Sequence, residues 1–402
     1  MQSPKATNRS AVLAEVLRAA PASRKQVAEA TGISSATVTR VVDQLLAEGV
    51  LREGSEIVSE NRGRRAVLLD LVADRSYVLG IDLGASNTRF ILADLNARPV
   101  LVCEVQTPSD LDTLRLADWL AGEVRSACGK KWPLVDSICM GLPGAVSRVD
   151  GSVSNATHLP QVDGTVFLEA FEGTVQLKLL TDNDANLALL GEQRFGAART
   201  SPTAAMLTLG TGLGAGLAID GNVLKGSHGL IGEFGQLPIG PLGGRLEHMV
   251  TGPGILQRAH EAGLPLNTPA DLFAENAGHL HSLRAHFDHA LMIVLTAISV
   301  SCDPETIVLG GGIAKSLTTS LSRYQATLER NLRVSPTLVP AELGDFSGAA
   351  GAVVSSLRAI YADLGIQPEF LADLPATQAL TPSSIGKARM ISPQKNVHLG
   401  SI

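Results

Sequence analysis

Along the first seventy residues, the spacing of apolar positions changes from helical to strand-like. Apolar residues recur every three or four positions over residues 9–20, and Pro21 ends that pattern. A short helix is expected over residues 24–30 and a longer one over residues 34–48. Apolar runs at residues 50–58 and 66–71 are then typical of two strands. This order predicts three helices followed by a two-stranded wing.

The second and third predicted helices carry the spacing of a helix-turn-helix. Ala28 lets two helices cross closely, Gly32 takes the left-handed turn conformation, and Val38 packs the second helix of the motif against the first. The outward face of that second helix would enter a major groove with Ser34, Ser35, Ala36, Thr39 and Arg40. The tip of the wing suits a narrow minor groove and carries Arg62, Arg64 and Arg65. The alternative is a small packing module with a solvated basic loop.

The rest of the chain contains one kind of turn twice. Residues 77–96 and 204–220 each consist of an apolar strand, a turn rich in glycine and hydroxyl residues, and a second apolar strand. Gly84 and Gly210 occupy matching places in the two turns. Such turns expose successive backbone N–H groups, and glycine permits the close approach of an anion. Two copies indicate two similar lobes around a phosphate-bearing ligand.

Further elements give the body an α/β fold class. The pattern predicts strands over residues 135–140, 177–181, 306–309 and 337–343, and helices over residues 110–128, 184–191, 285–302, 314–331 and 348–364. From about residue 367 the chain is rich in Pro, Ser and Thr without apolar periodicity, which predicts a disordered tail. We therefore expect domains at residues 1–73, 74–200, 201–366 and 367–402, with the last helix able to return to the first lobe.

Composition and charge narrow the class of protein. Hydrophobic residues make up 45% of the chain, which is enough for sizeable cores. Aromatic residues make up only 3% of the chain. The first 72 residues hold ten Lys and Arg against eight Asp and Glu, a net charge of +2, whereas the whole chain carries −6. A slightly basic head on an acidic body fits DNA contact confined to the head. The four cysteines form no CxxC pair, and we expect neither a signal peptide nor an apolar run of membrane-spanning length, so we predict a cytoplasmic protein with no membrane contact.

Six short segments of the body match the sequence motifs of one protein family. They lie at residues 82–84, 183–186, 210–216, 232–236, 246–252 and 307–312. Through them, residues 76–365 resemble the ROK family of sugar kinases and repressors. With the head included, residues 9–365 are similar to its transcription-regulator branch, the xylose- and N-acetylglucosamine-repressor type. The resemblance implies a winged helix-turn-helix followed by a two-lobed actin/hexokinase-like (ribonuclease H-like) ATPase fold.

The resemblance also implies roles for individual residues. In a family kinase, Asp184 would be the general base that takes the proton of the attacked sugar hydroxyl. Sugar contacts are implied for Asn183, Asp184, Glu233, Glu247, His158 and Gln236. Nucleotide contacts, if retained, are implied for Asp82, Gly84, Thr211, Gly212, Gly310 and Gly311. Taken alone, Asn183 and Asp184 are more typical of a helix cap, and Glu233 of a surface charge; their register with the whole pattern favours the functional interpretation.

The chain departs from the family pattern in two places. The four zinc ligands of the family, one His and three Cys, are replaced by Gln236, Pro238, Gly240 and Arg245, so we predict that the zinc site is absent. Hydrogen bonds of Gln236 and Arg245 are a candidate means of holding that loop instead. In the first phosphate turn, Ala85 and Asn87 replace the usual Gly and Lys, which weakens the case for phosphoryl transfer.

The sequence therefore predicts a sugar-responsive regulator, a repressor, in which a sugar or sugar derivative between the lobes moves the heads on an inverted-repeat operator. It would be a homodimer or homotetramer that requires no cofactor, with ATP and Mg²⁺ as optional ligands. One alternative is an active ATP-dependent kinase for a hexose or N-acetylhexosamine that carries a DNA-binding head. Another is a sugar sensor that binds a partner protein, with the head only bridging subunits.

Overall fold

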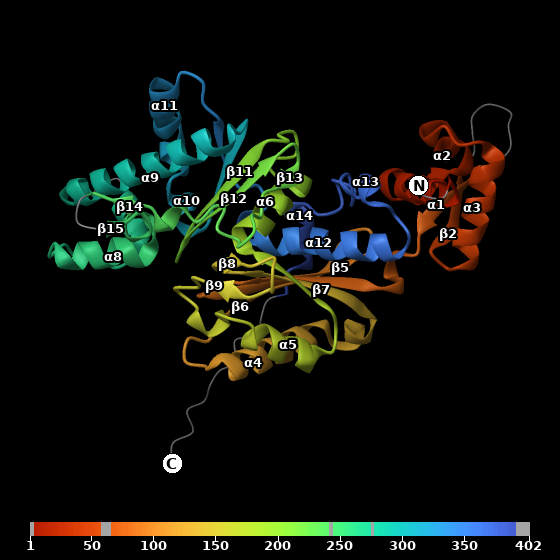
Figure 1. Cartoon of the computed structure of the whole chain (residues 1–402), viewed down its shortest axis with the longest axis horizontal. Coiled ribbons are helices and arrows are strands. Elements are labelled where there is room, and N and C mark those ends of the chain that lie inside the picture. Colours follow the sequence, from red (N-terminus) through yellow and green to blue (C-terminus); the bar gives the residue numbers. More distant parts are fainter. Residues whose placement is uncertain (1–3, 58–65, 241–243, 275–276, 391–402) are drawn as a thin grey trace, which may run out of the picture.

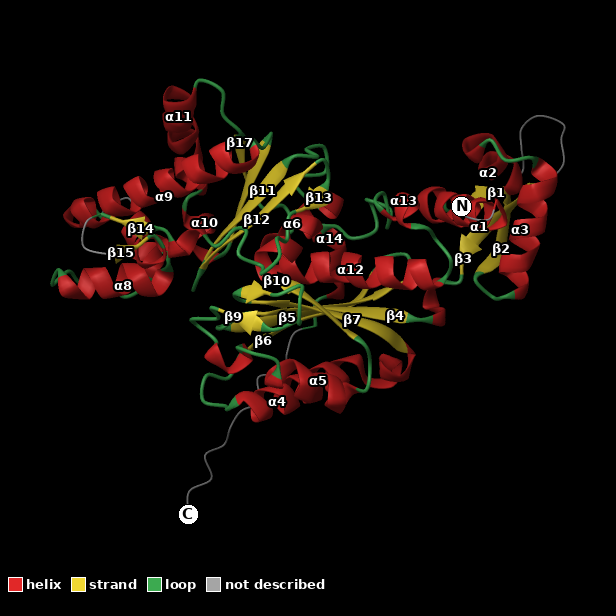
Figure 2. Ribbon diagram, in the orientation of Figure 1, coloured by secondary structure: helices red, strands yellow, loops and turns green. Residues whose placement is uncertain are grey.

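The computed structural model describes residues 4–57, 66–240, 244–274 and 277–390. They form a small N-terminal head at one end of the molecule and a larger body with two lobes (Figure 1). Each lobe is built on a five-stranded sheet, and helices pack on the sheets (Figure 2). The architecture expected from the sequence, a winged helix-turn-helix followed by a two-lobed α/β body, is confirmed.

The head contains α1 (Pro4–Ala19), α2 (Arg24–Thr31), α3 (Ser35–Ala47) and a sheet of β1 (Ala22–Ser23), β3 (Ala66–Leu71) and β2 (Leu51–Ile57) in that order. Ser23 begins α2 by accepting a hydrogen bond from the backbone N–H of Gln26, and Gly32 ends it with φ = 68°. Ser34 begins α3 in the same way, and Val38 is buried against the head's core. The turn between α2 and α3 therefore forms as the spacing predicts.

The sheet of the first lobe has the order β10-β7-β4-β5-β6. Its strands are β4 (Tyr77–Leu83), β5 (Asn87–Asp94), β6 (Pro99–Gln106), β7 (Val135–Leu142) and β10 (Leu179–Asn183). Strands β4 and β5 are antiparallel and enclose the first glycine turn, whereas β7 and β10 run parallel to β4. On the outer face lie α4 (Thr113–Cys128) and α5 (Val166–Val175), and a small hairpin of β8 (Ala145–Val146) and β9 (Val153–Ser154) follows β7.

The sheet of the second lobe has the order β13-β12-β11-β16-β17. Its strands are β11 (Ala204–Leu209), β12 (Leu213–Ile219), β13 (Asn222–Val223), β16 (Thr306–Gly310) and β17 (Thr337–Pro340). The helices of this lobe are α7 (Glu247–Val250), α8 (Gly252–Glu261), α9 (His281–Cys302), α10 (Gly312–Ser316) and α11 (Leu321–Leu332). Strands β11 and β12 enclose the second glycine turn, so the two lobes present matching turns.

Two helices, α6 (Asp184–Phe195) and α12 (Ser347–Asp363), lie side by side between the two sheets (Figures 1 and 2). Glycines permit this close packing: a Cβ at Gly351 would lie 1.8 Å from the Leu187 carbonyl oxygen, and one at Gly80 would lie 2.3 Å from that of Ala349. Helix α12 therefore packs on β4 and β7, and the last helix of the predicted second lobe returns to the first.

Three predictions about elements need correction. The helix expected over residues 314–331 is two helices, α10 and α11, separated by a short 3-10 turn at residues 318–320. Strand β6 and helices α5 and α8 were not predicted from the sequence. The expectation that no apolar run reaches membrane-spanning length also fails by length and composition, because residues 278–302 meet that criterion. In the fold, Phe287, Leu291 and Leu295 of α9 are buried in the core of the second lobe, as in a core helix of a folded domain.

The prediction of a disordered tail from residue 367 is wrong as far as residue 390. This C-terminal segment contains α13 (Pro368–Leu371) and α14 (Pro382–Ala388), and Leu374, Leu380 and Ile385 are buried in the same core as the head and α12. These three apolar residues are spaced too irregularly to produce a helical or strand-like hydrophobic pattern, so the polar composition of the segment dominates the prediction. Residues 391–402 lie outside the described part of the chain.

Candidate functional site

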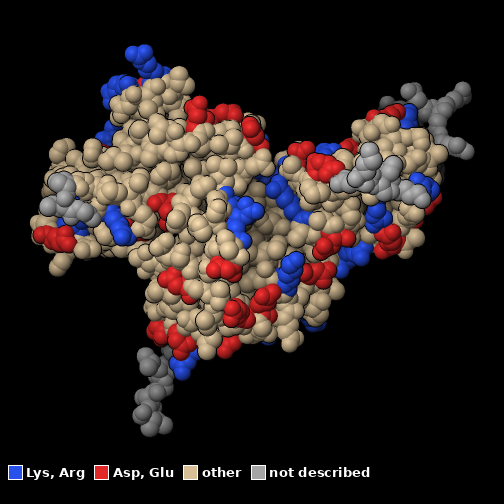
Figure 3. Space-filling view, in the orientation of Figure 1, with Lys and Arg blue, Asp and Glu red and all other residues tan. Residues whose placement is uncertain are grey.

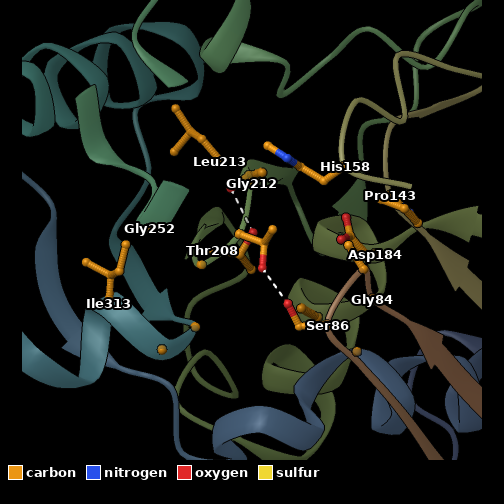
Figure 4. Close-up of a pocket in the computed structure, with 18 of the residues that line it drawn as sticks. Gly84, Ser86, Pro143, His158, Asp184, Thr208, Gly212, Leu213, Gly252 and Ile313 are labelled. Carbon is orange, nitrogen blue, oxygen red and sulfur yellow. Dashed lines mark hydrogen bonds between the residues drawn. The ribbon is translucent and has the colours of Figure 1, made fainter. Parts of the chain in front are cut away.

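A cleft of about 800 Å³ lies between the two lobes. Both glycine turns line it, together with the start of α6, the start of α12 and the segments before and after α7. Figure 4 shows Ser86 and Gly84 of the first lobe facing Thr208 and Gly212 of the second, with Asp184 and His158 beside them. Elements from both lobes therefore contribute polar groups to one cavity.

Asp184 is placed in the cleft by the beginning of α6. Its Oδ1 accepts a 2.7 Å hydrogen bond from the N–H of Ala185, and a Cβ at Gly216 of β12 would lie 2.6 Å from the Ala185 carbonyl oxygen. Glycine in β12 thus lets the first turn of α6, which belongs to the first lobe, approach the second sheet. Burial raises the pKa of Asp184 to about 6, although backbone hydrogen bonds oppose that shift.

Glu233 reaches the same cavity from the loop after β13. The preceding Gly232 has φ = +96°, and a Cβ there would lie 1.8 Å from the Ala215 carbonyl oxygen, so only glycine fits. Burial raises the pKa of Glu233 to about 7, and the charges of Asp184 and Glu247 add to the effect. A carboxyl in this state can accept or donate a hydrogen bond to a ligand hydroxyl near neutral pH.

Glu247 and His158 form a pair across the cavity. Glu247 opens α7 in the second lobe, and its Oε1 lies 3.3 Å from Nε2 of His158, which follows β9 in the first lobe. The His158 imidazole holds the pKa of Glu247 below its usual value. The pair therefore joins the two lobes across the cleft.

Asn183 has a structural role as well as a place in the cleft. Its side-chain oxygen accepts a hydrogen bond from the N–H of Asn186 and so caps α6, and its Nδ2 donates to the Gly144 carbonyl at 2.9 Å. The helix-cap interpretation of Asn183 is confirmed, and its contact with a sugar stays a prediction. Asn183, Asp184, Glu233, Glu247, His158 and Gln236, the predicted sugar-binding set, all line the cavity.

The phosphate end of the cleft is formed by the two glycine turns and the turn after β16. Ser86 Oγ and Thr211 Oγ1 are 3.1 Å apart, a hydrogen bond that joins the turns of opposite lobes (Figure 4). Asp82, Gly84, Thr211, Gly212 and Gly311 line the cavity, as predicted. Gly310 does not, because it lies within β16, where a Cβ would lie 2.4 Å from the Met206 methyl group. The glycines of these turns leave backbone N–H groups at the cavity, and nucleotide binding there stays a prediction.

The loop that holds zinc in the family is closed here by other means. Gln236 accepts a 2.5 Å hydrogen bond from the Arg245 guanidinium, and β14 (Pro238–Ile239) pairs with β15 (Gly244–Arg245). An amide, a proline, a glycine and an arginine offer no thiolate or imidazole ligand, so these residues do not fit zinc. The hydrogen bond proposed from the sequence for this loop is confirmed.

The predicted DNA-binding face is accessible on the head. Ser34, Ser35, Ala36, Thr39 and Arg40 are all exposed on α3, whereas Val38, Val41 and Val42 of the same helix are buried. The amphipathic pattern thus presents one polar face of α3 to the outside. Arg62, Arg64 and Arg65 lie outside the described residues.

The structure adds cleft residues that the sequence analysis did not single out. Lys315 of α10 forms an ion pair with Asp345, which precedes α12, and its Nζ lies 2.5 Å from the Asp345 Oδ2. Both residues line the cavity. Leu256 of α8 and Pro269 add apolar side chains to the lining of the cavity. Lys315 has a weak sequence signal, because it is the first charged residue after the glycine turn at residues 310–312; Leu256 and Pro269 have none.

The carboxyl of Asp82, which is half-buried at the cleft, predicts an unusual pH dependence of stability. Burial, with the charge of Asp184, raises the pKa of Asp82 to about 7. A group whose pKa is higher in the folded state binds more protons there than in the unfolded chain, so its contribution falls as the pH rises from about 4 to about 7. We therefore expect Asp82→Asn to raise the free energy of unfolding by about 2 kcal/mol at pH 8 and to have almost no effect at pH 4.

Urea unfolding at several pH values would check this prediction. Asp110→Asn is a matched control, because Asp110 is exposed and forms no ion pair within the described residues. It should leave the pH profile unchanged. An Asp82→Asn profile parallel to that of the wild type would contradict the prediction.

A family model described as the ROK family matches residues 78–358, and a model of winged helix-turn-helix DNA-binding domains matches residues 6–52. The chain is 29% identical over 290 residues to a glucokinase of Halalkalibacterium halodurans, covering 64% of this chain and 86% of that protein. It is 28% identical over 244 residues to the DNA-binding transcriptional dual regulator NagC of Escherichia coli, covering 60% of this chain and 59% of that protein.

Among solved structures, the chain is similar to a ROK family transcriptional regulator described as a homologue of the Escherichia coli MLC protein. The TM-score is 0.71 at 21% identity, and the match covers 92% of this chain and 99% of that one. This likeness supports the arrangement of a head and a two-lobed body in one chain.

Proposed function

The chain belongs to the ROK family, and because it also carries a winged helix-turn-helix head, we propose that it is a sugar-responsive transcriptional repressor. A sugar or sugar derivative bound between the lobes would be the effector, and operator DNA would be the target of the head. The protein would act in the cytoplasm, where that DNA lies.

One observation carries this proposal: a polar interlobe cleft and an exposed recognition helix occur in the same chain. Asp184, Glu233 and Glu247 offer carboxylates to sugar hydroxyls, and Arg40 is available to a base edge. A sugar kinase does not need a DNA-binding head, and a DNA-binding protein without an effector does not need the cleft.

Helix α12 offers a path by which occupancy of the cleft could reach the head. Its first residues line the cleft, and a Cβ at Gly348 would lie 2.8 Å from the Asp82 carboxyl group. At its other end, the Leu364 carbonyl accepts hydrogen bonds of 3.3 Å from Nε and from an Nη atom of Arg9 in α1. A rigid helix joined to both sites can transmit lobe closure to the head, and the sugar shifts the equilibrium only by its different affinities for the open and closed states.

A single head reads one half-site, so the operator would be an inverted repeat bound by a homodimer or homotetramer. Fluorescence anisotropy with the protein's own upstream DNA, titrated with a panel of hexoses and N-acetylhexosamines, tests the proposal. We expect specific binding that one sugar of the panel changes at least tenfold. Absence of binding to that DNA, or binding that no sugar or sugar phosphate changes, would contradict it.

A sugar kinase is the second candidate, favoured by the position of Asp184 in a cleft that both glycine turns line. The nucleotide would supply the phosphoryl group when bound to Asp82, Gly84, Thr211, Gly212 and Gly311. Asp184, with its raised pKa, would take the proton of the sugar hydroxyl. A coupled assay with ATP, Mg²⁺ and the same sugars would detect it, and turnover that disappears in Asp184→Asn would favour this candidate.

A further inference from the structure

A second cavity, of about 640 Å³, lies where the head meets the body. Leu17 and Arg18 of α1 line it from the head, and Arg98 and Arg194 line it from the body. Asp373 and residues 375–379 line it from the C-terminal segment. Figure 3 shows Lys and Arg side chains around the indentation between head and body. We call this space the junction cavity.

The junction cavity carries excess positive charge. Its lining contains three arginines, Arg18, Arg98 and Arg194, against one acidic residue, Asp373, and the Asp373 carboxylate is 4.0 Å from Arg18. Such an excess is unfavourable in a partly enclosed space unless an anion compensates it.

Arg194 forms the back of the cavity. Its guanidinium donates to the carbonyl oxygens of Asp373 and Pro375, and the neighbouring Arg358 donates to those of Ala372 and Leu374 at 2.8 and 3.1 Å. These neutral partners fix the two side chains but do not neutralise them. Burial and the charge of Arg358 lower the pKa of Arg194 to about 10, and the charge of Asp373 opposes this shift.

Arg18 and Arg98 are the groups available to a ligand. Both are exposed, and within the described part of the chain no hydrogen bond or ion pair engages the Arg98 guanidinium. The Arg18 guanidinium also forms an ion pair with the Glu15 carboxylate, with Nη1 and Oε2 2.8 Å apart. Guanidinium groups bind phosphate through two parallel N–H···O bonds, which favours a phosphate over a simple halide.

We propose that the junction cavity binds a small phosphate-bearing metabolite, with its phosphate between Arg18, Arg98 and Arg194. The volume falls in the range of small-molecule sites, and Asn96, Thr377 and Gln378 add polar groups for the rest of the ligand. Because Arg18 belongs to the head and the other two arginines to the body, the anion would hold the head in its docked position. This site is separate from the interlobe cleft and does not depend on a sugar binding there.

Isothermal titration calorimetry on the full chain tests the site, with inorganic phosphate, glucose 6-phosphate and glucose as probes at ionic strength matched with NaCl. The glucose 6-phosphate titration is repeated in Glu233→Gln, so that binding in the interlobe cleft is recognised separately. We expect saturable binding of at least one phosphate-bearing probe, and the tighter of the two identifies free phosphate or an organic phosphate as the ligand. Arg98→Gln should weaken that binding at least tenfold.

Arg148→Gln is the matched control, because Arg148 is an exposed arginine of the body that does not line either cavity. It should change the dissociation constant by less than twofold. Ligand should also slow hydrogen exchange of residues 372–380 in the wild type but not in Arg98→Gln. The proposal is overturned if neither phosphate probe binds, if Arg98→Gln and Arg148→Gln weaken binding equally, or if Glu233→Gln alone abolishes it.

Discussion

Replacing Glu233 with Gln is expected to weaken binding of the effector sugar roughly 30- to 150-fold and to remove its effect on operator binding, while operator binding itself persists. Hydrogen bonds to a charged group contribute about 1.5–3 kcal/mol, and the upper part of that range corresponds to this loss. Gln keeps the shape of the side chain, so Gly232 and the loop around it need not move. The change therefore removes the charge and little else.

Calorimetry with the responsive sugar, with and without operator, would measure both effects. Because the pKa of Glu233 is about 7, the wild-type sugar affinity should also vary with pH around neutrality, and this variation should shrink in Glu233→Gln. Glu169→Gln, on the exposed side of α5, is the control and should behave as the wild type. Loss of operator binding in a folded Glu233→Gln variant would argue against a separate effector pocket.

Arg40→Ala is expected to cost about 1–3 kcal/mol of operator affinity and to relax the sequence preference at one base position. Arg40 is exposed on α3, on the face opposite the buried Val38 and Val42, so removing its side chain leaves the head's core intact. A contact to a base edge discriminates between base pairs, whereas a contact to a phosphate does not.

Anisotropy titrations with the operator, single-base variants of it and random DNA would measure this effect. Arg64→Ala, at the wing tip expected from the sequence, should weaken binding more evenly across these sequences and lower the dependence on salt. Arg115→Ala, on exposed α4 of the body, is the control for total charge. Equal losses from Arg40→Ala on operator and random DNA would contradict the assignment of α3 to the major groove.

Local features of the chain made much of the molecule predictable. The spacing of Ala28, Gly32 and Val38 determines a turn between two helices because each residue acts within a few positions of itself. The glycine turns at Gly84 and Gly210 and the caps at Ser23 and Ser34 have the same short range. Even the bond between Gln236 and Arg245 links residues only nine apart, and the sequence suggested it.

Contacts between segments far apart in the sequence are harder to predict from the sequence. Arg194 and Arg358 hold the carbonyl oxygens of residues 372–375, and no local pattern marks those carbonyls as acceptors. The polar, Pro-rich composition of this segment therefore predicts a disordered tail, whereas the fold orders it as far as residue 390. The motif around Gly310 predicts that this residue lies in the cleft. In the structure it lies within β16, and the side chain of Met206 on the adjacent strand β11 occupies the space beside it.

By itself, the sequence determined the head and the α/β class of the body, because periodicity and turn chemistry act over neighbouring positions. Its resemblance to the family pointed to many, but not all, of the residues that line the cleft. Only the tertiary structure decided that Ser86 meets Thr211, that His158 meets Glu247, and that three arginines gather between head and body. These pairings join residues far apart in the chain, and the free energy of such contacts depends on how the lobes pack rather than on any local preference.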